Sequence, residues 1–211
     1  MKIIEQSYEI LSITHPKEQL RLIEKIGRVA YKSEDKINKE SYKDFIKMIK
    51  ERNHQSVLEH SFLSVKFITD RGISHELVRH RLASYTQEST RFCNYSKDKF
   101  NNELTFINNP LMLNFPISLN RYLIECEQLY ILSVSHNVPP QIARAILPNC
   151  LKTEIVISTN FREWIYIFNL RLFNKTAHPQ MRSLLKPLYI ELQEKYPEIF
   201  DNNIEELNDV N

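Results

Sequence analysis

Glycine is almost absent from this chain, which contains only Gly27 and Gly72 among its 211 residues. At the average usage of about 7 percent, a chain of this length would hold roughly 15 glycines. Because the two glycines lie far apart, neither a G-x-G-x-x-G turn nor a G-x-x-x-x-G-K-[ST] loop is present. The sequence therefore excludes the two standard glycine-built phosphate sites, and any bound nucleotide must contact side chains and helix ends.

The remaining composition is that of a folded globular protein. Hydrophobic residues make up 42% and charged residues 26% of the chain, which argues against disorder. The length favours a single domain over residues 1–211, with an acidic tail after about residue 200 that we expect to fray. The net charge of +2 predicts no general attraction to nucleic acids or membranes.

The cysteines and the start of the chain indicate a cytoplasmic protein. Cys93, Cys126 and Cys150 are widely spaced and form no C-x-x-C pair, so they predict neither a disulfide framework nor a thiolate zinc site. The first residues become polar before an apolar signal core could form. No apolar run approaches ~18 residues, so we expect no membrane-spanning segment.

The amino-terminal half predicts three helices. Apolar residues recur at helical spacing over residues 17–32 and 41–52, and Ser41 is a suitable cap for the second helix. We expect Ser74 to cap a short helix that runs from His75 to about His80.

Four more helices are predicted in the carboxyl-terminal half. Pro116 opens one that runs to about His136, and another runs from the Pro139-Pro140 pair to near Pro148. Helices over 160–173 and 179–195 follow, the second bent at Pro187. The buried stripe expected on the helix that begins at Pro116 consists of Tyr122, Cys126, Leu129 and Leu132.

Strands are predicted at three places. Apolar and polar residues alternate over 63–67, residues 104–107 form a brief apolar run, and residues 152–159 are rich in β-branched side chains. Strands and helices do not alternate regularly, so the fold class is α+β and not a Rossmann fold. We expect a mixed or antiparallel central sheet flanked by helices; its strand order does not follow from the sequence.

Polar groups suited to an anionic ligand concentrate in residues 79–91. This segment holds three arginines, a histidine, four Ser or Thr hydroxyls and a Gln-Glu pair. A guanidinium offers a planar fork of donors that matches phosphate, and hydroxyls bond the remaining oxygens. One alternative is a solvated surface segment whose arginines pair with carboxylates. Another is a nucleic-acid-binding module, in which Tyr85, Phe92 and Tyr95 stack on bases.

The same segment resembles the signature of a known enzyme family. Arg79-His80-Arg81, seven further residues and then Ser89 resemble the R-H-R-x7-S motif of flavin-dependent thymidylate synthases. Other motifs of that family follow in its order across residues 16–200. These are residues 54–60 (H-x-S-V-L-E-H), 143–148 (A-R-x-x-L-P), 160–162 and 169–171 (paired helix motifs) and 178–180.

The resemblance implies an activity and its cofactors. Members of the family make thymidylate from deoxyuridylate (dUMP), with a methylene group from methylenetetrahydrofolate and a hydride from FAD that NADPH has reduced. They are homotetramers whose active sites form where subunits meet. The resemblance implies no nucleic-acid partner and no membrane partner.

The resemblance also implies site residues. Those expected at FAD are Ser56, Arg79, His80, Arg81, Gln87, Asn160, Arg162 and Tyr166. Those expected at dUMP are Glu76, Arg79, Gln87, Glu88, Ser89, Arg91, Arg144 and Arg171. Arg171 is the expected catalytic residue, because a cation beside the pyrimidine favours loss of its ring N–H proton. The competing interpretations are a salt bridge for Arg171, a surface arginine for Arg144 and helix capping for Ser56.

The chain departs from the family pattern at four places. Gln87 stands where many relatives carry Glu, and Glu76 stands where some carry Gln. Tyr166 replaces an Asn or His that faces the flavin. The spacing from Arg171 to His178 is longer than usual, so His178 is not among the expected site residues.

Two other chemistries compete with this interpretation. His75-Glu76 followed by His80 is close to the H-E-x-x-H of zinc proteases, but the second histidine lies at i+5 and is rotated off the shared helix face. This spacing disfavours a zinc site, so we expect no metal. A zinc hydrolase is kept as the third alternative. Cys150 follows Pro148-Asn149, and the classical thymidylate synthases use a nucleophilic cysteine near a proline, but we expect all three cysteines to be small apolar residues of the interior.

Overall fold

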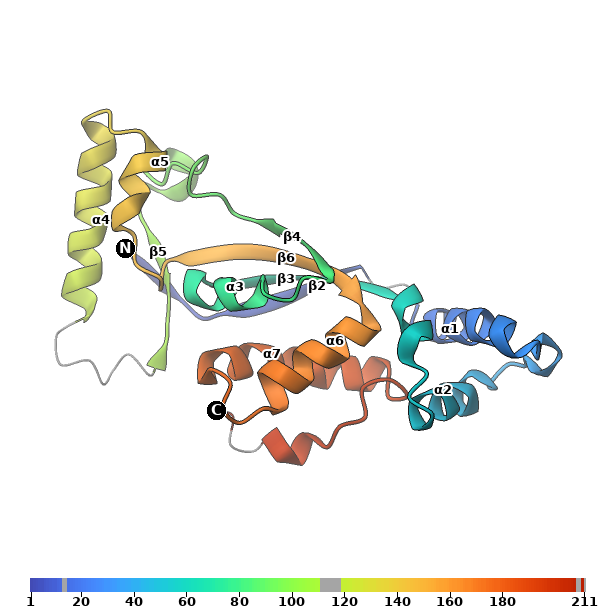
Figure 1. Ribbon diagram of the computed structural model, residues 1–211. Helices are drawn as coiled ribbons and strands as arrows, with labels where there is room; N and C mark the ends of the chain where they lie inside the picture. Colours follow the sequence, from blue (N-terminus) through green and yellow to red (C-terminus); the bar gives the residue numbers. More distant parts are fainter. Residues whose placement is uncertain (13–14, 111–118, 208–209, 211) are drawn as a thin grey trace. The chain divides into compact units, whose positions relative to one another are not determined.

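The computed structural model describes residues 1–12, 15–110, 119–207 and 210 (Figure 1). The fold is α+β, as the sequence predicts. The chain divides into two compact units, which are described separately below. Unit 1 comprises Met1–Ser7, Phe67–Arg79 and Tyr85–Val156, and unit 2 comprises Tyr8–Lys66, His80–Ser84 and Ile157–Asn211.

A four-stranded antiparallel sheet has the strand order β2-β3-β6-β4. Its strands are β2 (Ser7–Ser12), β3 (Phe62–Asp70), β6 (Lys152–Asn160) and β4 (Ala83–Gln87). The predictions for β3 and β6 are confirmed, because every second side chain in both is buried. Strands β2 and β4 were not predicted; both lie at sheet edges, where a solvated face gives a weaker apolar pattern.

A second sheet lies within unit 1. Strand β1 (Lys2–Ile4) pairs in parallel with β5 (Thr105–Ile107), and Ile3 is opposite Phe106. The predicted strand at 104–107 is thus confirmed, whereas β1 was not predicted. Phe106 also bridges to Leu151, which joins this sheet to the residues just before β6.

The short helix of unit 1 begins four residues earlier than predicted. Helix α3 is Arg71–Leu77, and its cap is Asp70, whose carboxylate accepts from the N–H of Ile73 at 2.8 Å. The predicted capping role of Ser74 is therefore wrong. Its hydroxyl lies inside the helix and donates to the carbonyl of Arg71 at 2.9 Å. An Asp directly after a strand is the better cap, since its charge also suits the helix N-terminus.

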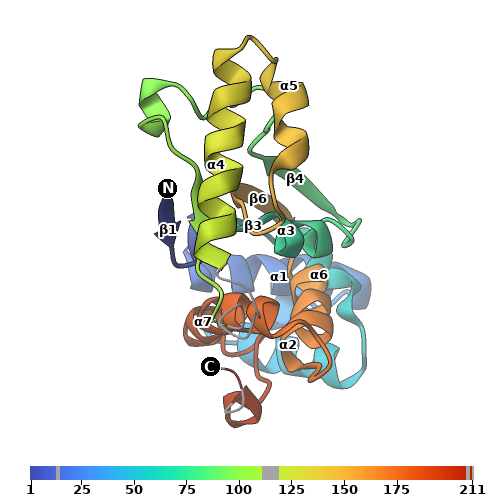
Figure 2. The same cartoon turned by 90° about the vertical axis from the view of Figure 1, so that its left-hand side faces the viewer.

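Helices α4 (Leu119–Ser135) and α5 (Pro140–Ala143) lie side by side in unit 1 (Figure 2). A 3₁₀ turn, Arg144–Ile146, continues α5. The predicted helix starts at Pro116, which lies outside the described residues. The core of this unit consists of Tyr95, Leu104, Phe106, Leu123, Tyr130, Ala143, Cys150 and Leu151.

The predicted buried stripe of α4 is wrong for three of its four residues. Tyr122, Leu129 and Leu132 are 47%, 51% and 55% exposed. The buried side chains are Leu123, Cys126 and Tyr130. The core therefore packs against a face rotated by one residue, or about 100°, from the expected one. Apolar residues occupy two neighbouring faces of this helix. The apolar periodicity therefore does not show which of the two faces is buried, and the predicted face was the exposed one.

Unit 2 contains the other long helices. They are α1 (Pro16–Tyr31), α2 (Tyr42–Glu51), α6 (Phe161–Phe168) and α7 (Pro179–Lys195), all near their predicted positions. Short 3₁₀ turns lie at Glu34–Lys36, Gln55–His60 and Ile204–Leu207. An aromatic cluster forms the core beside α6 and α7: Phe161, Trp164, Phe168, Tyr189, Tyr196 and Phe200. In the tail, Leu207 is buried.

Gly27 permits close packing of α1 on α2. A Cβ atom at this position would lie 2.5 Å from the ring of Phe45, which is itself buried. One of the two glycines therefore serves helix packing rather than ligand binding. On the same pair of helices, Ser41 precedes α2 but its side chain does not cap it. The hydroxyl instead donates to the buried carboxylate of Glu24 at 2.9 Å, so the predicted capping bond is wrong.

Across the described residues, none of the helices has the length and apolar character needed to cross a membrane.

Candidate active site

Arg171 projects from an irregular turn in unit 2. Helix α6 ends at Phe168 and continues as a five-residue π-helix, Asn169–Phe173, where a single α-helix had been predicted to residue 173. Arg182 of α7, which is buried, donates from Nε to the carbonyl of Leu172 at 2.9 Å and so supports this turn. Single π turns occur frequently at functional sites because they redirect side chains. The turn sets the direction of Arg171.

His80 is a partner of Arg171 within unit 2. The Nε–H of Arg171 donates to His80 Nε2 at 3.3 Å, and His80 is only 3% exposed. The chain just after His80 is fixed by Thr159 of β6, whose hydroxyl donates to the carbonyl of Leu82 at 2.6 Å. The ring of Tyr166 meets the His80 ring edge to face, with centroids 5.7 Å apart.

A carboxylate completes the surroundings of the histidine. Glu163 Oε1 lies 3.4 Å from His80 Nδ1, and Glu163 is buried. Burial and the nearby Arg171 guanidinium lower the pKa of His80 to about 4, so the ring is neutral at neutral pH. Burial raises the pKa of Glu163 above its ordinary value. In the cluster of Arg171, His80 and Glu163, a permanently charged guanidinium therefore lies against a neutral imidazole.

Glu163 was missed in the sequence analysis, although a signal for it exists. Asn160 caps α6 by accepting from the N–H of Glu163 at 2.8 Å. Asn-x-x-Glu before an apolar run is the pattern of a capping box, which places the Glu in the first helical turn. Asn160, predicted to contact FAD, thus has a structural role on this helix as well.

The other residues expected at FAD are largely exposed. Arg162 forms an ion pair with Glu59, and these two side chains are 52% and 46% exposed. Ser56 lies on the surface in the 3₁₀ turn Gln55–His60, so the interpretation of Ser56 as a helix cap is wrong. Arg81 is exposed in unit 2, and Arg79 is exposed at the end of unit 1.

The residues expected at dUMP lie in unit 1, except for Arg171. Gln87 is held in place, since its amide donates to Ser74 at 2.8 Å and to buried Thr153 at 3.1 Å. Arg144 is exposed and donates to Thr90 at 3.2 Å. The remaining members are Ser89, Arg91 and the half-buried Glu76 of α3.

Ser89 and Arg91 form a tight turn after β4. The N–H of Arg91 donates to the hydroxyl of Ser89 at 3.3 Å. The guanidinium of Arg91 is exposed and lies 5.3 Å from the ring centroid of Phe92. A hydroxyl and an exposed arginine therefore belong to the same turn of unit 1, and both residue types are suited to an anionic group.

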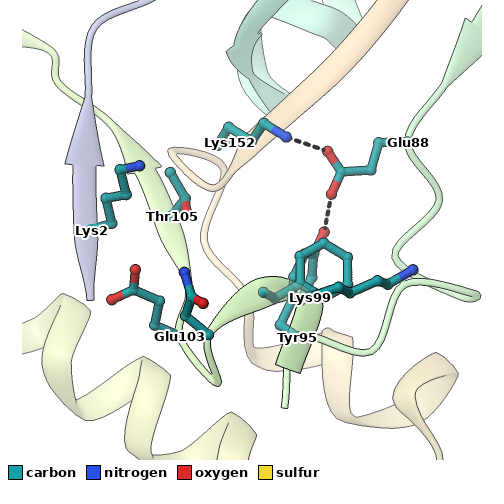
Figure 3. A pocket seen from close by; sticks show the side chains of 9 residues that line it. Lys2, Glu88, Tyr95, Lys99, Glu103, Thr105 and Lys152 are labelled. Atoms are coloured by element: carbon teal, nitrogen blue, oxygen red, sulfur yellow. Dashed lines mark hydrogen bonds and ion pairs between the residues drawn. The ribbon is translucent and has the colours of Figure 1, made fainter. Parts of the chain in front are cut away.

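Glu88 points into a small pocket of about 180 Å³ in unit 1 (Figure 3). Its carboxylate accepts from Lys152 at 2.9 Å and from the hydroxyl of Tyr95 at 2.9 Å. Burial alone would lower the pKa of Lys152, but hydrogen bonds to Glu154 and Glu88 raise it. The carboxylate of Glu88 is thus engaged by the protein itself.

The residues considered for metal or nucleophilic chemistry differ in their exposure to solvent. His75 is exposed and His80 is buried, and within the described ranges no group of three or more His, Cys, Asp or Glu side chains is placed to hold a metal. Cys126 and Cys150 are buried and Cys93 is partly buried. Burial raises the pKa of Cys150 to about 11, which keeps it a thiol at neutral pH.

Comparison with known proteins decides the family. The sequence profile of Thy1, described as "Thymidylate synthase complementing protein", matches residues 11–198. The chain belongs to the Thy1 family. The resemblance inferred from the R-H-R-x7-S motif is therefore confirmed, and it covers nearly the span that the motifs indicated.

Named relatives of this Thy1 chain are flavin-dependent thymidylate synthases. The protein of Geobacter sulfurreducens is 32% identical over 79% of this chain and 71% of its own length. That of Pyrococcus furiosus is 33% identical over 72% of this chain and 63% of its own length. That of Corynebacterium diphtheriae is 29% identical over 86% of this chain and 77% of its own length.

The fold of the Thy1 chain also matches a solved structure. The UMP/dUMP methylase PolB of Streptomyces cacaoi, solved with 5-Br dUMP bound, superposes with a TM-score of 0.75 at 16% identity. The match covers 95% of this chain and 96% of PolB, so the two proteins share their fold over nearly all of their lengths.

Proposed function

We propose that this Thy1 chain converts dUMP to thymidylate, with methylenetetrahydrofolate as the one-carbon donor and with FAD reduced by NADPH as the hydride source. The observation that carries the proposal is the Arg171–His80 pair. Arg171 lies on a π turn and donates to His80, and the relatives of the chain are flavin-dependent thymidylate synthases. An arginine that is held on a buried neutral histidine fits the role of electrostatic catalyst.

Arg171 would act by stabilising negative charge on the pyrimidine. A guanidinium stays protonated at neutral pH, so it cannot carry a proton, but it can favour the anion that forms when the ring N–H ionises. The anionic ring is a better carbon nucleophile toward the methylene group. Arg171 is half-buried, and partial exclusion of water strengthens its interaction with a developing charge.

The chain's residues fit FAD without a glycine loop. Arg79 and Arg81 are exposed cations suited to the diphosphate, and Arg162 adds a third whose carboxylate partner, Glu59, is also on the surface. Tyr166 is 54% exposed and its ring packs edge to face with that of His80, so it offers an aromatic surface beside Arg171 and His80. Ser56, His80, Gln87 and Asn160 complete the set proposed for FAD. The bound cofactor supplies the hydride.

The anionic substrate would be bound mainly by residues of unit 1. Ser89 and Arg91 provide a hydroxyl and a guanidinium for the phosphate of dUMP, and Arg144 provides a second cation. Gln87 uses its N–H₂ group within the protein, so its carbonyl oxygen is the atom suited to a substrate hydroxyl. Glu76 would repel phosphate and is better placed at the sugar or base, and Glu88 would contribute by supporting the turn after β4.

The exposed face of α4 supports the proposal of a homotetramer. Tyr122, Leu129 and Leu132 are about half exposed on one helix, and Ile142 of α5 is 59% exposed. Large apolar side chains gathered on one surface are typical of subunit contacts. We propose that a second copy of the chain covers them, and that subunits share active sites as the family resemblance implies.

The proposal is tested by spectroscopy and product analysis on the purified protein. We expect a visible flavin absorption that NADPH bleaches, and formation of thymidylate only when dUMP and methylenetetrahydrofolate are both added. A colourless protein that binds no added FAD would overturn the proposal. Salt-dependent binding of oligonucleotides by such a protein would favour the nucleic-acid-binding alternative, and stoichiometric zinc would favour the hydrolase.

A further inference from the structure

The hydrogen bond between Arg171 and His80 fixes which nitrogen of the imidazole carries the proton. A guanidinium has only donors, so His80 Nε2 must accept through its lone pair. A proton on Nε2 would set two donors against each other at 3.3 Å. The neutral ring that accepts from Arg171 therefore has its proton on Nδ1.

The proton on Nδ1 faces a carboxylate. Glu163 Oε1 lies 3.4 Å from Nδ1, and the two side chains are 9% and 2% exposed, respectively. In water-poor surroundings, an acceptor beside one ring nitrogen favours the tautomer that donates to it. Arg171 thus donates to one side of the His80 ring, and a carboxylate oxygen lies within ion-pair distance of the other side.

We propose that Glu163 is a positioning residue, which holds His80 as the Nδ1–H tautomer and thereby orients the Arg171 guanidinium. The catalytic meaning of this orientation rests on the proposed function of Arg171. The tautomer itself does not depend on that function. Without an acceptor at position 163, His80 loses its preference for Nδ1–H, and in the Nε2–H form it can no longer accept from Arg171.

Glu163 also belongs to the first turn of α6, so a purely structural role must be separated from positioning. Its N–H is bonded by Asn160, and this bond involves only the backbone of residue 163. Two variants separate the roles. Glu163→Gln keeps a side-chain oxygen that can accept from Nδ1–H, whereas Glu163→Leu keeps a similar volume without an acceptor.

The direct test is nitrogen NMR of the flavin-loaded protein labelled with ¹⁵N-histidine. The chain has seven histidines, and the His80 signals are those lost in His80→Gln. We expect the proton on Nδ1 in the wild type and in Glu163→Gln, and a substantial Nε2–H population in Glu163→Leu. A proton on Nε2 in the wild type, or an unchanged tautomer in Glu163→Leu, would overturn the proposal.

Kinetics then test whether the tautomer matters for Arg171. We expect Glu163→Leu to lower kcat about tenfold, the effect of one lost hydrogen bond in the transition state, with flavin content and thermal unfolding near those of Glu163→Gln. Glu163→Gln should keep most of the wild-type kcat. Equal losses in both variants would contradict positioning. Absence of thymidylate formation by the wild type would refute the proposed function instead, and the NMR result would still decide the role of Glu163.

Discussion

The neutral state of His80 makes the folded protein sensitive to acid. The unfolded chain takes up a proton at this residue near the ordinary pKa of 6.5, whereas the folded protein does so only near 4. Between these values the unfolded state binds more protons, so folding stability falls as the pH falls. His80→Gln removes the titrating ring and leaves an amide oxygen that can accept from Arg171.

The size of the effect follows from the two pKa values. At pH 5 almost every unfolded chain carries the proton on this histidine and few folded chains do. The wild type should therefore lose about 2 kcal/mol more stability between pH 7 and pH 5 than His80→Gln does, given the shift from 6.5 to about 4. Every other titratable group is present in both proteins, so the difference between the proteins reports on residue 80 together with Glu163 beside it.

Urea unfolding followed by tryptophan fluorescence measures this difference. Trp164 is the only tryptophan, and it is buried on α6 beside Glu163. Both proteins are unfolded at pH 7 and pH 5 at one protein concentration, since assembly adds to apparent stability. Equal losses of stability in the wild type and His80→Gln would refute the inference that His80 is held neutral by burial and by Arg171.

Two further substitutions test one contact in each unit: the packing at Gly27 in unit 2 and the ion pair of Lys152 with Glu88 in unit 1. Gly27→Ala should lower the free energy of unfolding by about 1 kcal/mol, because the overlap with Phe45 outweighs the better helix propensity of alanine; a more stable variant in urea unfolding would contradict this. Lys152→Met should cost about 2 kcal/mol by removing a partner of Glu88, whose side chain is only 12% exposed. Lys43→Met breaks an exposed pair and serves as the control, with an expected change below about 0.5 kcal/mol in thermal or urea unfolding.

The sequence predicted those elements whose pattern arises from burial on one face. Strands β3 and β6 alternate cleanly, and helices α1 and α2 carry one apolar stripe each. Strand β4 could not be predicted in this way, because Ala-Ser-Tyr-Thr-Gln has no buried side chain among its five residues. The sequence of Asn169–Phe173 predicts ordinary helix, and it shows neither the π geometry nor the bond that Arg182 of α7 donates to this turn.

The candidate site was found in the sequence by resemblance rather than by physical principle. His80 and Arg171 are 91 residues apart, and no local pattern links them. Glu163 was missed because a Glu in the first turn of a helix has an ordinary explanation as a capping residue. The scarcity of glycine predicts a ligand site built from side chains, and Gly27 itself lies where α1 packs against Phe45.

The role of Arg171 is tested most directly by release of hydrogen from carbon 5 of the pyrimidine. Flavin-loaded wild type, Arg171→Ala and the control Arg52→Ala, which changes an exposed arginine at the end of α2, receive tritiated dUMP with methylenetetrahydrofolate and NADPH. We expect tritium release by the wild type and by Arg52→Ala, and a loss of at least about 100-fold in Arg171→Ala with its flavin retained. Release at the wild-type rate by flavin-loaded Arg171→Ala would contradict the mechanism.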